Sequence, residues 1–377
     1  MTDRNYRNVF LEIGKTQEEI NKRVEDTFNE IFYGKDKFFS YTEDGTMAYL
    51  EDTGNNDTRT EGISYGMMMC VQLDKKKEFD CLWNWAKTNM FMTEGENAGY
   101  FAWSVATDGS KNADGPAPDG EEFFAMALFF ASHRWGDGSG IYEYSKEARE
   151  LLHTCIHMED KGFGHNMWNR ENHLIKFVPG LEFTDPSYHL PHFYELFALW
   201  ANEEDRDFWK EAAASSRRYL QKACNKDTGL SAEYSEYDGS PYLKLDINGR
   251  HDWYFSDAYR TIANIALDYE WFSKDTEFGK WSVDIANKLQ CFFGETVAGD
   301  DRGIYELDGR RIEGEALHPV AITATNAQAS LAADGKYAYQ FVEDFWNCPL
   351  RTGERRYYDN CLYMFAMLAL SGMYRIY

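Results

Sequence analysis

The stretch "FFAMALFFA", residues 123–131, is apolar on every side of the helix that it would form. A helix without a polar face is buried all round. Four further stretches share this character: "FYELFALWA" (193–201), "TIANIALDYEWF" (261–272), "AITATNAQASLAA" (321–333) and "LYMFAMLALSG" (362–372). Buried helices that recur along one chain need a surrounding layer. The pattern therefore predicts an inner set of helices covered by an outer set.

The spacing of apolar residues supplies that outer set. In "TQEEINKRVEDTFNEIFYG" (16–34), Thr16 and Glu19 form a capping box and Gly34 marks the end. Further helices are predicted at 61–73, 76–90, 120–135, 143–158, 188–201, 203–224, 255–272, 275–293, 320–333, 336–346 and 358–373. Short and long connections alternate between them, which groups the twelve helices into six pairs. We therefore predict an all-α fold, an (α/α)6 barrel, in which the even-numbered helices form the inner ring.

The long connections are expected to lie on one face, above the N-terminal ends of the inner helices. Three of them place Asp-Gly between aromatic or β-branched residues, which is typical of a β-hairpin. They are "FFSYTEDGTMAYL" (38–50), "YFAWSVATDGS" (100–110) and "GIYELDGRRIEG" (303–314). No Pro-, Ser- or Gly-rich linker divides the chain, so we predict one domain over residues 1–377.

Composition excludes several partners. The net charge of −24 disfavours binding to nucleic acid and to anionic membrane surfaces. No apolar run approaches the ~20 residues of a membrane-spanning helix, and the start of the chain lacks the apolar region of a secretory signal. The seven cysteines are scattered and never occur as CxxC, which indicates reduced thiols. These features predict a cytoplasmic protein.

Polar side chains stand where the inner helices begin. The predicted starts carry Glu61, Asp119, Tyr188, Asp257 and His318. A single acid at a helix N-terminus is an ordinary cap. Acids, a tyrosine and a histidine that converge on one rim instead predict an active site.

Carboxylates combined with aromatic rings suit the cleavage of sugar polymers. A pair of carboxyl groups, one protonated and one ionised, cleaves an acetal, and aromatic faces stack on sugar rings. Glu61 is the candidate for the protonated member. This requires its pKa to be raised by burial near Met67 and Met68 and by the charge of the neighbouring Asp119, and these effects must outweigh the helix dipole, which lowers it. The aromatic candidates for the cleft are Phe101, Trp103, Trp253, Tyr254, Tyr357 and Tyr358.

Six blocks of the sequence resemble glycoside hydrolase family 8, and within it the reducing-end xylose-releasing exo-oligoxylanases. The similarity runs from about residue 6 to the end of the chain. The blocks are "RTEGISYGMMM", "GYFAWS", "GPAPDGEEFFAMALFFASHRWG", "DPSYHLPHFYELFALWANEEDR", "YFSDAYRTIANIALD" and "TGERRYYDNCLYMFAMLALSG". The resemblance implies an (α/α)6 barrel that hydrolyses glycosidic bonds with inversion, without a cofactor.

The resemblance also implies roles for individual residues. Glu61 corresponds to the general acid and Asp257 to the general base. Asp119 corresponds to the acid that binds and distorts the sugar at the cut, and Tyr188 to the tyrosine that helps to hold the attacking water. Arg260 is expected to pair with Asp257 or to contact substrate. An inverting pair should stand roughly 6.5–9.5 Å apart.

The element Leu317-His318-Pro319 matches the loop that blocks the cleft in the exo-oligoxylanases. His318 would then contact the terminal hydroxyl of the sugar just past the cut. The implied activity is hydrolysis of β-1,4-linked xylo-oligosaccharides from the reducing end, with release of xylose. The alternative within the family is an endo-acting β-1,4-xylanase or β-glucanase-type hydrolase.

Three other interpretations carry less weight. His153 and His157 have the i, i+4 spacing of a zinc pair, but the sequence offers no HExxH and no evident third ligand, so no metal is predicted there or at His189 and His192. A non-catalytic glycan-binding protein would not need both Glu61 and Asp257. An isoprenoid cyclase would need a DxDD or similar cluster, which the sequence lacks.

Overall fold

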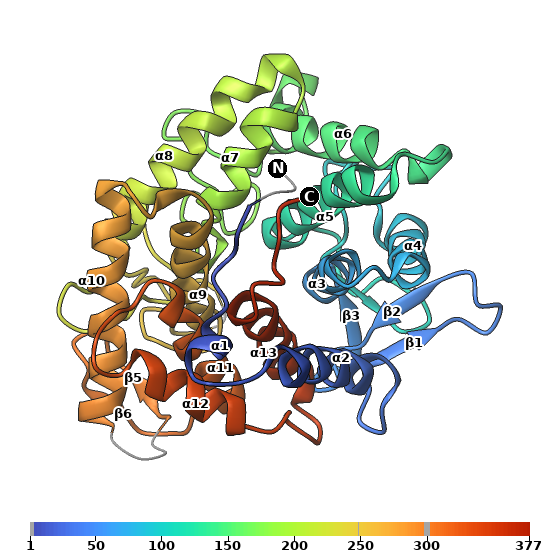
Figure 1. Ribbon diagram of the computed structural model, residues 1–377. Coiled ribbons are helices and arrows are strands. Elements are labelled where there is room, and N and C mark those ends of the chain that lie inside the picture. The colour runs from blue at the N-terminus through green and yellow to red at the C-terminus, as the bar shows by residue number, and fades with distance from the viewer. Residues whose placement is uncertain (1–3, 248, 298–301) are drawn as a thin grey trace.

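A computed structural model describes residues 4–247, 249–297 and 302–377. Within these ranges, helices of ten residues or more make up most of the regular structure (Figure 1). They are α2 (Gln17–Tyr33), α3 (Thr60–Gln72), α4 (Lys76–Trp85), α5 (Pro118–Trp135), α6 (Tyr144–His157), α7 (Pro191–Trp200), α8 (Arg206–Ala223), α9 (Tyr259–Asp268), α10 (Glu277–Cys291), α11 (Pro319–Gln328), α12 (Ala338–Asn347) and α13 (Arg356–Leu370). Each matches one predicted helix, and the short α1 (Val9–Glu12) is additional.

Alternate helices form a closed inner ring. Helix α3 packs on α5, α5 on α7, α7 on α9, α9 on α11 and α11 on α13, and α13 returns to α3. Each outer helix packs against an inner partner, as α4 does against α3 and α8 against α7 (Figure 1). Helix α2 lies against α13, which brings the first and last long helices together. The predicted (α/α)6 barrel is confirmed, including which helices are inside.

Helix α3 shows why the inner helices are apolar. Every residue of α3 is buried except Glu61, in its first turn. Gly62 allows Tyr357 of α13 to come close, because a Cβ built on Gly62 would lie 2.5 Å from the Tyr357 hydroxyl oxygen. The outer helix α2 instead buries only one stripe, and its capping box between Thr16 and Glu19 forms as predicted. The close packing around α3 leaves Glu61 as its one residue that reaches toward open space.

Three short antiparallel strand pairs lie in the long connections. The pairs are β1 (Phe39–Tyr41) with β2 (Ala48–Leu50), β3 (Asp57–Arg59) with β4 (Ser104–Ala106), and β5 (Ile304–Tyr305) with β6 (Arg311–Ile312). The first and third are predicted hairpins. The turn predicted at Asp-Gly within 100–110 also forms, because the Ala106 N–H donates to the Ser110 carbonyl at 2.8 Å and Val105 pairs with Lys111 in an antiparallel bridge. The sequence did not show that β4 also pairs with β3, which directly precedes α3. This pairing fixes the start of α3 and therefore the position of Glu61.

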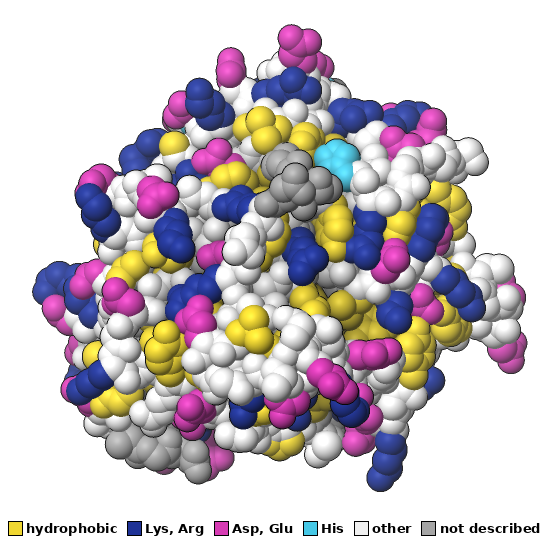
Figure 2. Space-filling model, in the orientation of Figure 1, with side chains coloured by type: hydrophobic (Ala, Val, Ile, Leu, Met, Phe, Trp, Pro, Cys, Tyr) yellow, Lys and Arg dark blue, Asp and Glu magenta, His cyan; other side chains and the backbone are white. Residues whose placement is uncertain are grey.

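One hydrophobic cluster extends from Val9 to Ile376 and includes side chains of all twelve long helices. The division of the chain into domains stays a prediction. Among the described residues, no helix combines the length and apolar character that crossing a membrane requires. On the face turned to the viewer in Figure 2, basic and acidic side chains are interspersed rather than gathered into patches of one sign.

Candidate active site

A cleft of about 400 Å³ opens at the N-terminal ends of α3, α5 and α9. It contains four of the predicted site residues with acidic or tyrosine side chains, namely Glu61, Asp119, Tyr188 and Asp257. The full lining is Arg59, Thr60, Glu61, Trp103, Ala117, Asp119, Phe177, Val178, Tyr188, Tyr234, Ile247, His251, Asp257 and Arg260. The structure therefore brings four of the five predicted rim residues together. The fifth, His318 at the start of α11, is not part of this lining, and its ring lies 4.7 Å from the ring of Tyr358.

Glu61 is held by two hydrogen-bond donors. The Tyr357 hydroxyl donates to Oε1 at 2.9 Å, and Nη1 of Arg260 donates to Oε2 at 2.9 Å. The pKa of Glu61 is raised to about 7, chiefly by burial, with Arg260 opposing the rise and the charges of Asp119 and Asp257 adding to it. Desolvation therefore outweighs both the cation and the helix N-terminus. Glu61 is a carboxyl group able to carry a proton near neutral pH.

Arg260, at the start of α9, connects the acids of the site. Besides Glu61, its Nη1 donates to Asp119 Oδ2 at 3.2 Å and to the Tyr65 hydroxyl at 2.9 Å. Its Nη2 lies 3.3 Å from Asp257 Oδ1. One guanidinium thus faces Glu61 through one nitrogen and Asp257 through the other. The sequence pointed to the pair with Asp257 but not to the contacts with Glu61 and Asp119.

Asp119 and Asp257 differ in exposure. Asp119, in the first turn of α5, is buried, and burial raises its pKa to about 6 against the opposing effect of Arg260. The Asp257 side chain is 26% exposed and therefore reachable by water. It sits in the short helix η6 (Ser256–Ala258), where Ser256 has a φ of 41°. Such backbone values are uncommon outside glycine and concentrate at functional sites.

Tyr188 ends the short helix η4 (Pro186–Tyr188), and its ring lies against the Arg260 guanidinium at 5.5 Å. Asp185 caps η4 by accepting the backbone N–H of Ser187 at 2.6 Å. Asp185 also stands 3.8 Å from Nη2 of Arg260 and is fully buried. It is a part of the acid cluster that the sequence analysis missed, although its position before a proline is typical of a cap.

The aromatic candidates separate into two groups. Trp103 is 38% exposed and lines the cleft, over the Arg59 guanidinium. Tyr357 binds Glu61, and the Tyr358 ring lies 5.9 Å from the Arg260 guanidinium. These two tyrosines are buried behind the cleft and reach the site only through Glu61 and Arg260, and the remaining three candidates have no such contact. Phe101 and Tyr254 pack in the core, and Trp253 donates its indole N–H to Glu233.

The cleft includes apolar and aromatic residues that the sequence analysis did not select. Phe177 and Val178 come from the connection between α6 and α7, and Tyr234, Ile247 and His251 from the connection between α8 and α9. Phe177 packs on Tyr234 with ring centroids 4.1 Å apart. These connections have no helical or strand period, so nothing in the local pattern shows which of their side chains face inward.

Asp359, a residue of α13, fixes the position of the His318 side chain. Nδ1 of His318 lies 2.9 Å from Asp359 Oδ2, while Asp359 Oδ1 accepts the backbone N–H of Ala321 at 2.8 Å. Arg351 also pairs with Asp359 and donates to the Leu317 carbonyl at 2.6 Å. The sequence analysis missed Asp359 and Arg351. Together they fasten the Leu317-His318-Pro319 element to the barrel.

The two histidine pairs have different surroundings. His189 is buried, with its ring nitrogens 2.9 Å from the hydroxyls of Thr184 and Ser216, and burial lowers its pKa to about 3. His153 and His157 share the carboxylate of Asp205, a third potential ligand that the sequence did not reveal.

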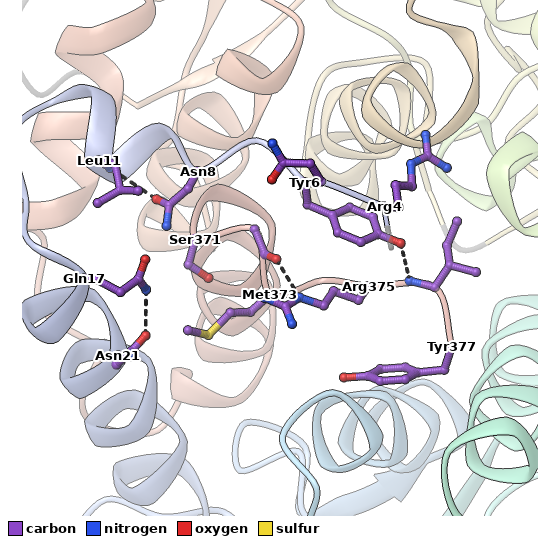
Figure 3. A pocket seen from close by; sticks show the side chains of 13 residues that line it. Arg4, Tyr6, Asn8, Leu11, Gln17, Asn21, Ser371, Met373, Arg375 and Tyr377 are labelled. Carbon is purple, nitrogen blue, oxygen red and sulfur yellow. Dashed lines mark hydrogen bonds between the residues drawn. The ribbon is translucent and has the colours of Figure 1, made fainter. Parts of the chain in front are cut away.

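A larger hollow, of about 630 Å³, lies at the opposite end of the barrel, between the two chain ends (Figure 3). Its lining contains no aspartate or glutamate. Arg4 donates to the Glu270 carbonyl and Arg375 to the Gly372 carbonyl, so both guanidinium groups serve to hold the terminal segments. Size alone does not make this hollow a catalytic site, because acetal cleavage needs a carboxyl pair.

A protonatable carboxyl, a second and more exposed carboxylate, and an aromatic cleft at the end of an (α/α)6 barrel define a glycoside hydrolase. The chain belongs to glycosyl hydrolases family 8, whose family model matches residues 30–372. This agrees with the resemblance carried by the six sequence blocks.

Related proteins cover almost the whole chain. A reducing end xylose-releasing exo-oligoxylanase of Halalkalibacterium halodurans is 58% identical over 99% of this chain and 95% of its own length. One of Bifidobacterium adolescentis is 52% identical over 97% of this chain and 96% of its own. Among solved structures, Rex8A from Paenibacillus barcinonensis complexed with xylose has a TM-score of 0.96 at 55% identity, covering 99% of this chain and 98% of that one.

The pKa of Glu61 gives a prediction for pH dependence. If Glu61 donates a proton, activity requires its protonated form and is lost as pH rises through its folded-state pKa. We therefore expect kcat/KM for xylotriose to fall about tenfold per pH unit above a pH of about 7. A pH profile of kcat/KM checks this. An alkaline limit near the ordinary glutamate pKa of about 4.3 would contradict it.

Proposed function

We propose that the protein hydrolyses β-1,4-linked xylo-oligosaccharides from the reducing end and releases xylose, with inversion at the anomeric carbon. The observation that carries this proposal is the pairing of Glu61 and Asp257 with opposite nitrogens of Arg260. His318 is linked to this group through Tyr358, whose ring lies 4.7 Å from the imidazole and 5.9 Å from the Arg260 guanidinium. Two relatives that match this chain over nearly its whole length are named as reducing end xylose-releasing exo-oligoxylanases, which supports the same substrate and the same end of attack for this protein.

In this mechanism Glu61 gives its proton to the glycosidic oxygen as the bond from that oxygen to the anomeric carbon breaks. A water molecule attacks the opposite face of the same carbon and passes a proton to Asp257. One bond breaks as the other forms, so the anomeric configuration inverts. The greater exposure of Asp257 suits a group that works through water.

The remaining side chains of the site would position the sugar and the water. Asp119, in the first turn of α5, lines the cleft and shares Nη1 of Arg260 with Glu61, where it can bind hydroxyls of the sugar that is cut. Tyr188 is placed beside Arg260 and Asp257, where its hydroxyl can help to hold the water. Trp103 offers an exposed ring for stacking on a further sugar.

His318 supports attack from the reducing end. Because Asp359 faces Nδ1, a neutral imidazole would place its proton there and leave Nε2 as an acceptor. An acceptor at this position suits the free anomeric hydroxyl of a terminal sugar. Arg351 donates to the carbonyl of Leu317 and so holds the Leu317-His318-Pro319 element in place. A cleft closed in this way would admit one sugar beyond the cut.

We expect the enzyme to discriminate against capped reducing ends. A methyl glycoside cannot donate to His318 and would leave a buried acceptor unpaired, which costs about 1–3 kcal/mol. Methyl β-xylotrioside should therefore be cleaved at least about tenfold less efficiently than xylotriose, as measured by kcat/KM.

The variant His318→Ala should lose that preference while it retains the catalytic carboxyl groups. A matched control is His165→Ala, a change of another histidine that is more than half exposed and outside the cleft. Equal cleavage of both substrates by the unchanged enzyme, or release of xylobiose and xylotriose from polymeric xylan, would favour the endo-acting alternative.

The proposed location is the cytoplasm. All seven cysteines lie among the described residues and none forms a disulfide there. Free thiols suit a reducing compartment. Short, neutral oligosaccharides would be the substrates available in such a compartment, in agreement with release of single xylose units rather than attack on a polymer.

A further inference from the structure

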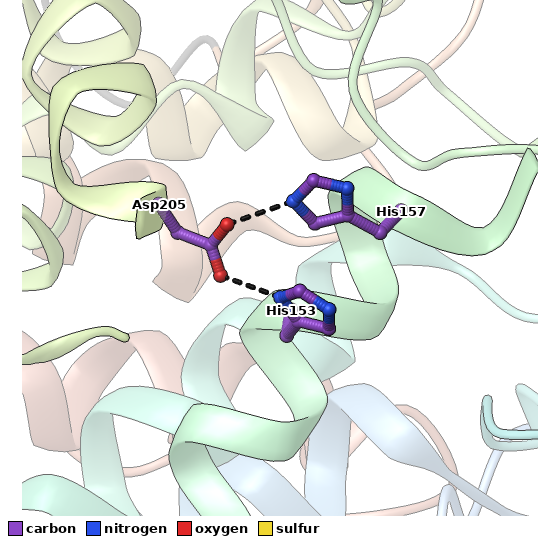
Figure 4. Close-up of side chains that lie close together, drawn as sticks. All are labelled: His153, His157 and Asp205. Atoms are coloured by element: carbon purple, nitrogen blue, oxygen red, sulfur yellow. Dashed lines mark hydrogen bonds and ion pairs between the residues drawn. The ribbon is translucent and has the colours of Figure 1, made fainter. Parts of the chain in front are cut away.

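The cluster of His153, His157 and Asp205 lies outside the cleft described above (Figure 4). Nδ1 of His153 lies 2.8 Å from Asp205 Oδ2, and Nε2 of His157 lies 2.7 Å from Asp205 Oδ1. The two rings are stacked with centroids 4.2 Å apart. Three potential ligand atoms, all within 4.8 Å of one another, therefore converge from two separate parts of the chain.

The surroundings of the cluster favour a cation. The Asp205 side chain is 1% exposed, and within the described residues its carboxylate faces the two imidazoles. Asp160 adds a second carboxylate, 2.6 Å from the other ring nitrogen of His157. Arg170 pairs with Asp160 and also contacts His157 Nδ1 at 2.7 Å, so one positive charge stands among two negative ones. The cluster retains a net negative charge.

We propose that His153, His157 and Asp205 form a binding site for a divalent transition ion such as Zn²⁺. Imidazole nitrogen and carboxylate oxygen are common zinc ligands, and three protein ligands plus a water complete a tetrahedral shell. The histidine side chains are 40% and 29% exposed, which leaves access for the ion and for that water.

The contact between His157 and Asp160 gives the site an outer shell. A histidine that binds a metal through Nε2 carries its proton on Nδ1 and commonly donates it to a carboxylate. Asp160 Oδ2 stands at that position, and Arg170 holds Asp160 in turn. This contact is an observation independent of the i, i+4 spacing. It distinguishes the cluster from two histidines that only share a carboxylate.

An ion at this position would connect two of the helical pairs. His153 and His157 belong to α6, whereas Asp205 ends the short helix η5 (Glu203–Asp205), which leads into α8. The connection that follows α6 carries Phe177 and Val178 into the cleft. We therefore assign the ion a structural role, in which it stabilises the folded chain and takes no part in the cleavage of the glycosidic bond.

Titration of the tag-free, chelator-treated full chain with ZnCl2 tests the site. Calorimetry should show one ion bound per chain, and the melting temperature should rise on addition of Zn²⁺ because the ion binds only the folded state. With Co²⁺ as the probe, a visible absorption band of four-coordinate cobalt should appear.

Asp205→Asn and His153→Ala should each weaken Zn²⁺ binding by more than tenfold, and Asp160→Asn by roughly 10–100-fold.

The control is His173→Asn, which removes another partly exposed histidine near α8, at a backbone position (φ 61°) that asparagine tolerates. It should bind Zn²⁺ as the unchanged protein does. Each variant should still cleave xylotriose, which confirms that it is folded. The proposal would be overturned if the unchanged protein did not bind Zn²⁺. It would also be overturned if Zn²⁺ binding and the rise in melting temperature were the same in the variants and in the control. The three side chains would then form only a hydrogen-bonded His-Asp-His contact.

Discussion

Glu61→Gln is expected to lower kcat for xylotriose by a factor of roughly 10²–10⁴, the usual contribution of a general acid. Glutamine keeps the size of the side chain and can still contact Tyr357 and Arg260. It has no carboxyl proton to give to the leaving oxygen. Steady-state kinetics at the optimal pH measure the effect, and circular dichroism confirms that the fold is intact.

The loss in Glu61→Gln should depend on the leaving group. Xylobiosyl fluoride of β configuration needs little protonation to leave, so its hydrolysis should fall far less than that of xylotriose. The control is Glu78→Gln on α4, which changes another carboxyl that accepts two side-chain hydrogen bonds, from the hydroxyls of Tyr33 and Tyr41, but lies outside the cleft. If Glu61→Gln kept more than a tenth of the unchanged activity on xylotriose, Glu61 would not be the acid.

Asp257→Ala should lower kcat to a similar extent, about 10²–10⁴-fold, because the attacking water loses the group that takes its proton. Here the leaving group should make little difference, since Glu61 remains. The substitution also removes a negative charge that raises the pKa of Glu61, so the alkaline limit of activity should move to lower pH. Kinetics on xylotriose and xylobiosyl fluoride over a range of pH distinguish this variant from Glu61→Gln.

Added azide provides a second test of Asp257. The small anion can occupy the space of the lost carboxylate and of the water, attack without a base, and yield a xylobiosyl azide of inverted, α configuration. Asp252→Asn, five residues earlier and paired with Arg250, is the control and should retain its activity. A β-configured azide, or no more than a small loss of activity in Asp257→Ala, would contradict the role of general base.

The sequence was sufficient for the elements that rest on a regular period. The apolar stretch at 123–131 and its counterparts identify inner helices because burial on every side leaves no polar face. The starts of these helices then locate Glu61 and Asp119, since an inner helix in this barrel begins at the rim. The same reasoning places Tyr188 and Asp257 on that rim.

The features that the sequence analysis missed depend on contacts between distant segments. Strand β4 pairs with β3 across more than forty residues, in addition to the local turn at Asp108-Gly109, and no local pattern indicates that distant partner. Phe101 and Trp103 are two residues apart, yet one is core and the other lines the cleft. Asp205 reaches His153 and His157 only because η5, which precedes α8, lies beside the last turns of α6. Such partners can be identified only from the three-dimensional arrangement of the helices.

The most direct test of the account uses xylotriose labelled with ¹³C at the anomeric carbon of its reducing-end sugar. Time-resolved NMR during hydrolysis follows both the label and the configuration of the new reducing end. We predict that all of the label appears in free xylose and that the xylobiose formed first is the α-anomer. Label in xylobiose, or a β-anomer formed first, would contradict release of xylose from the reducing end with inversion.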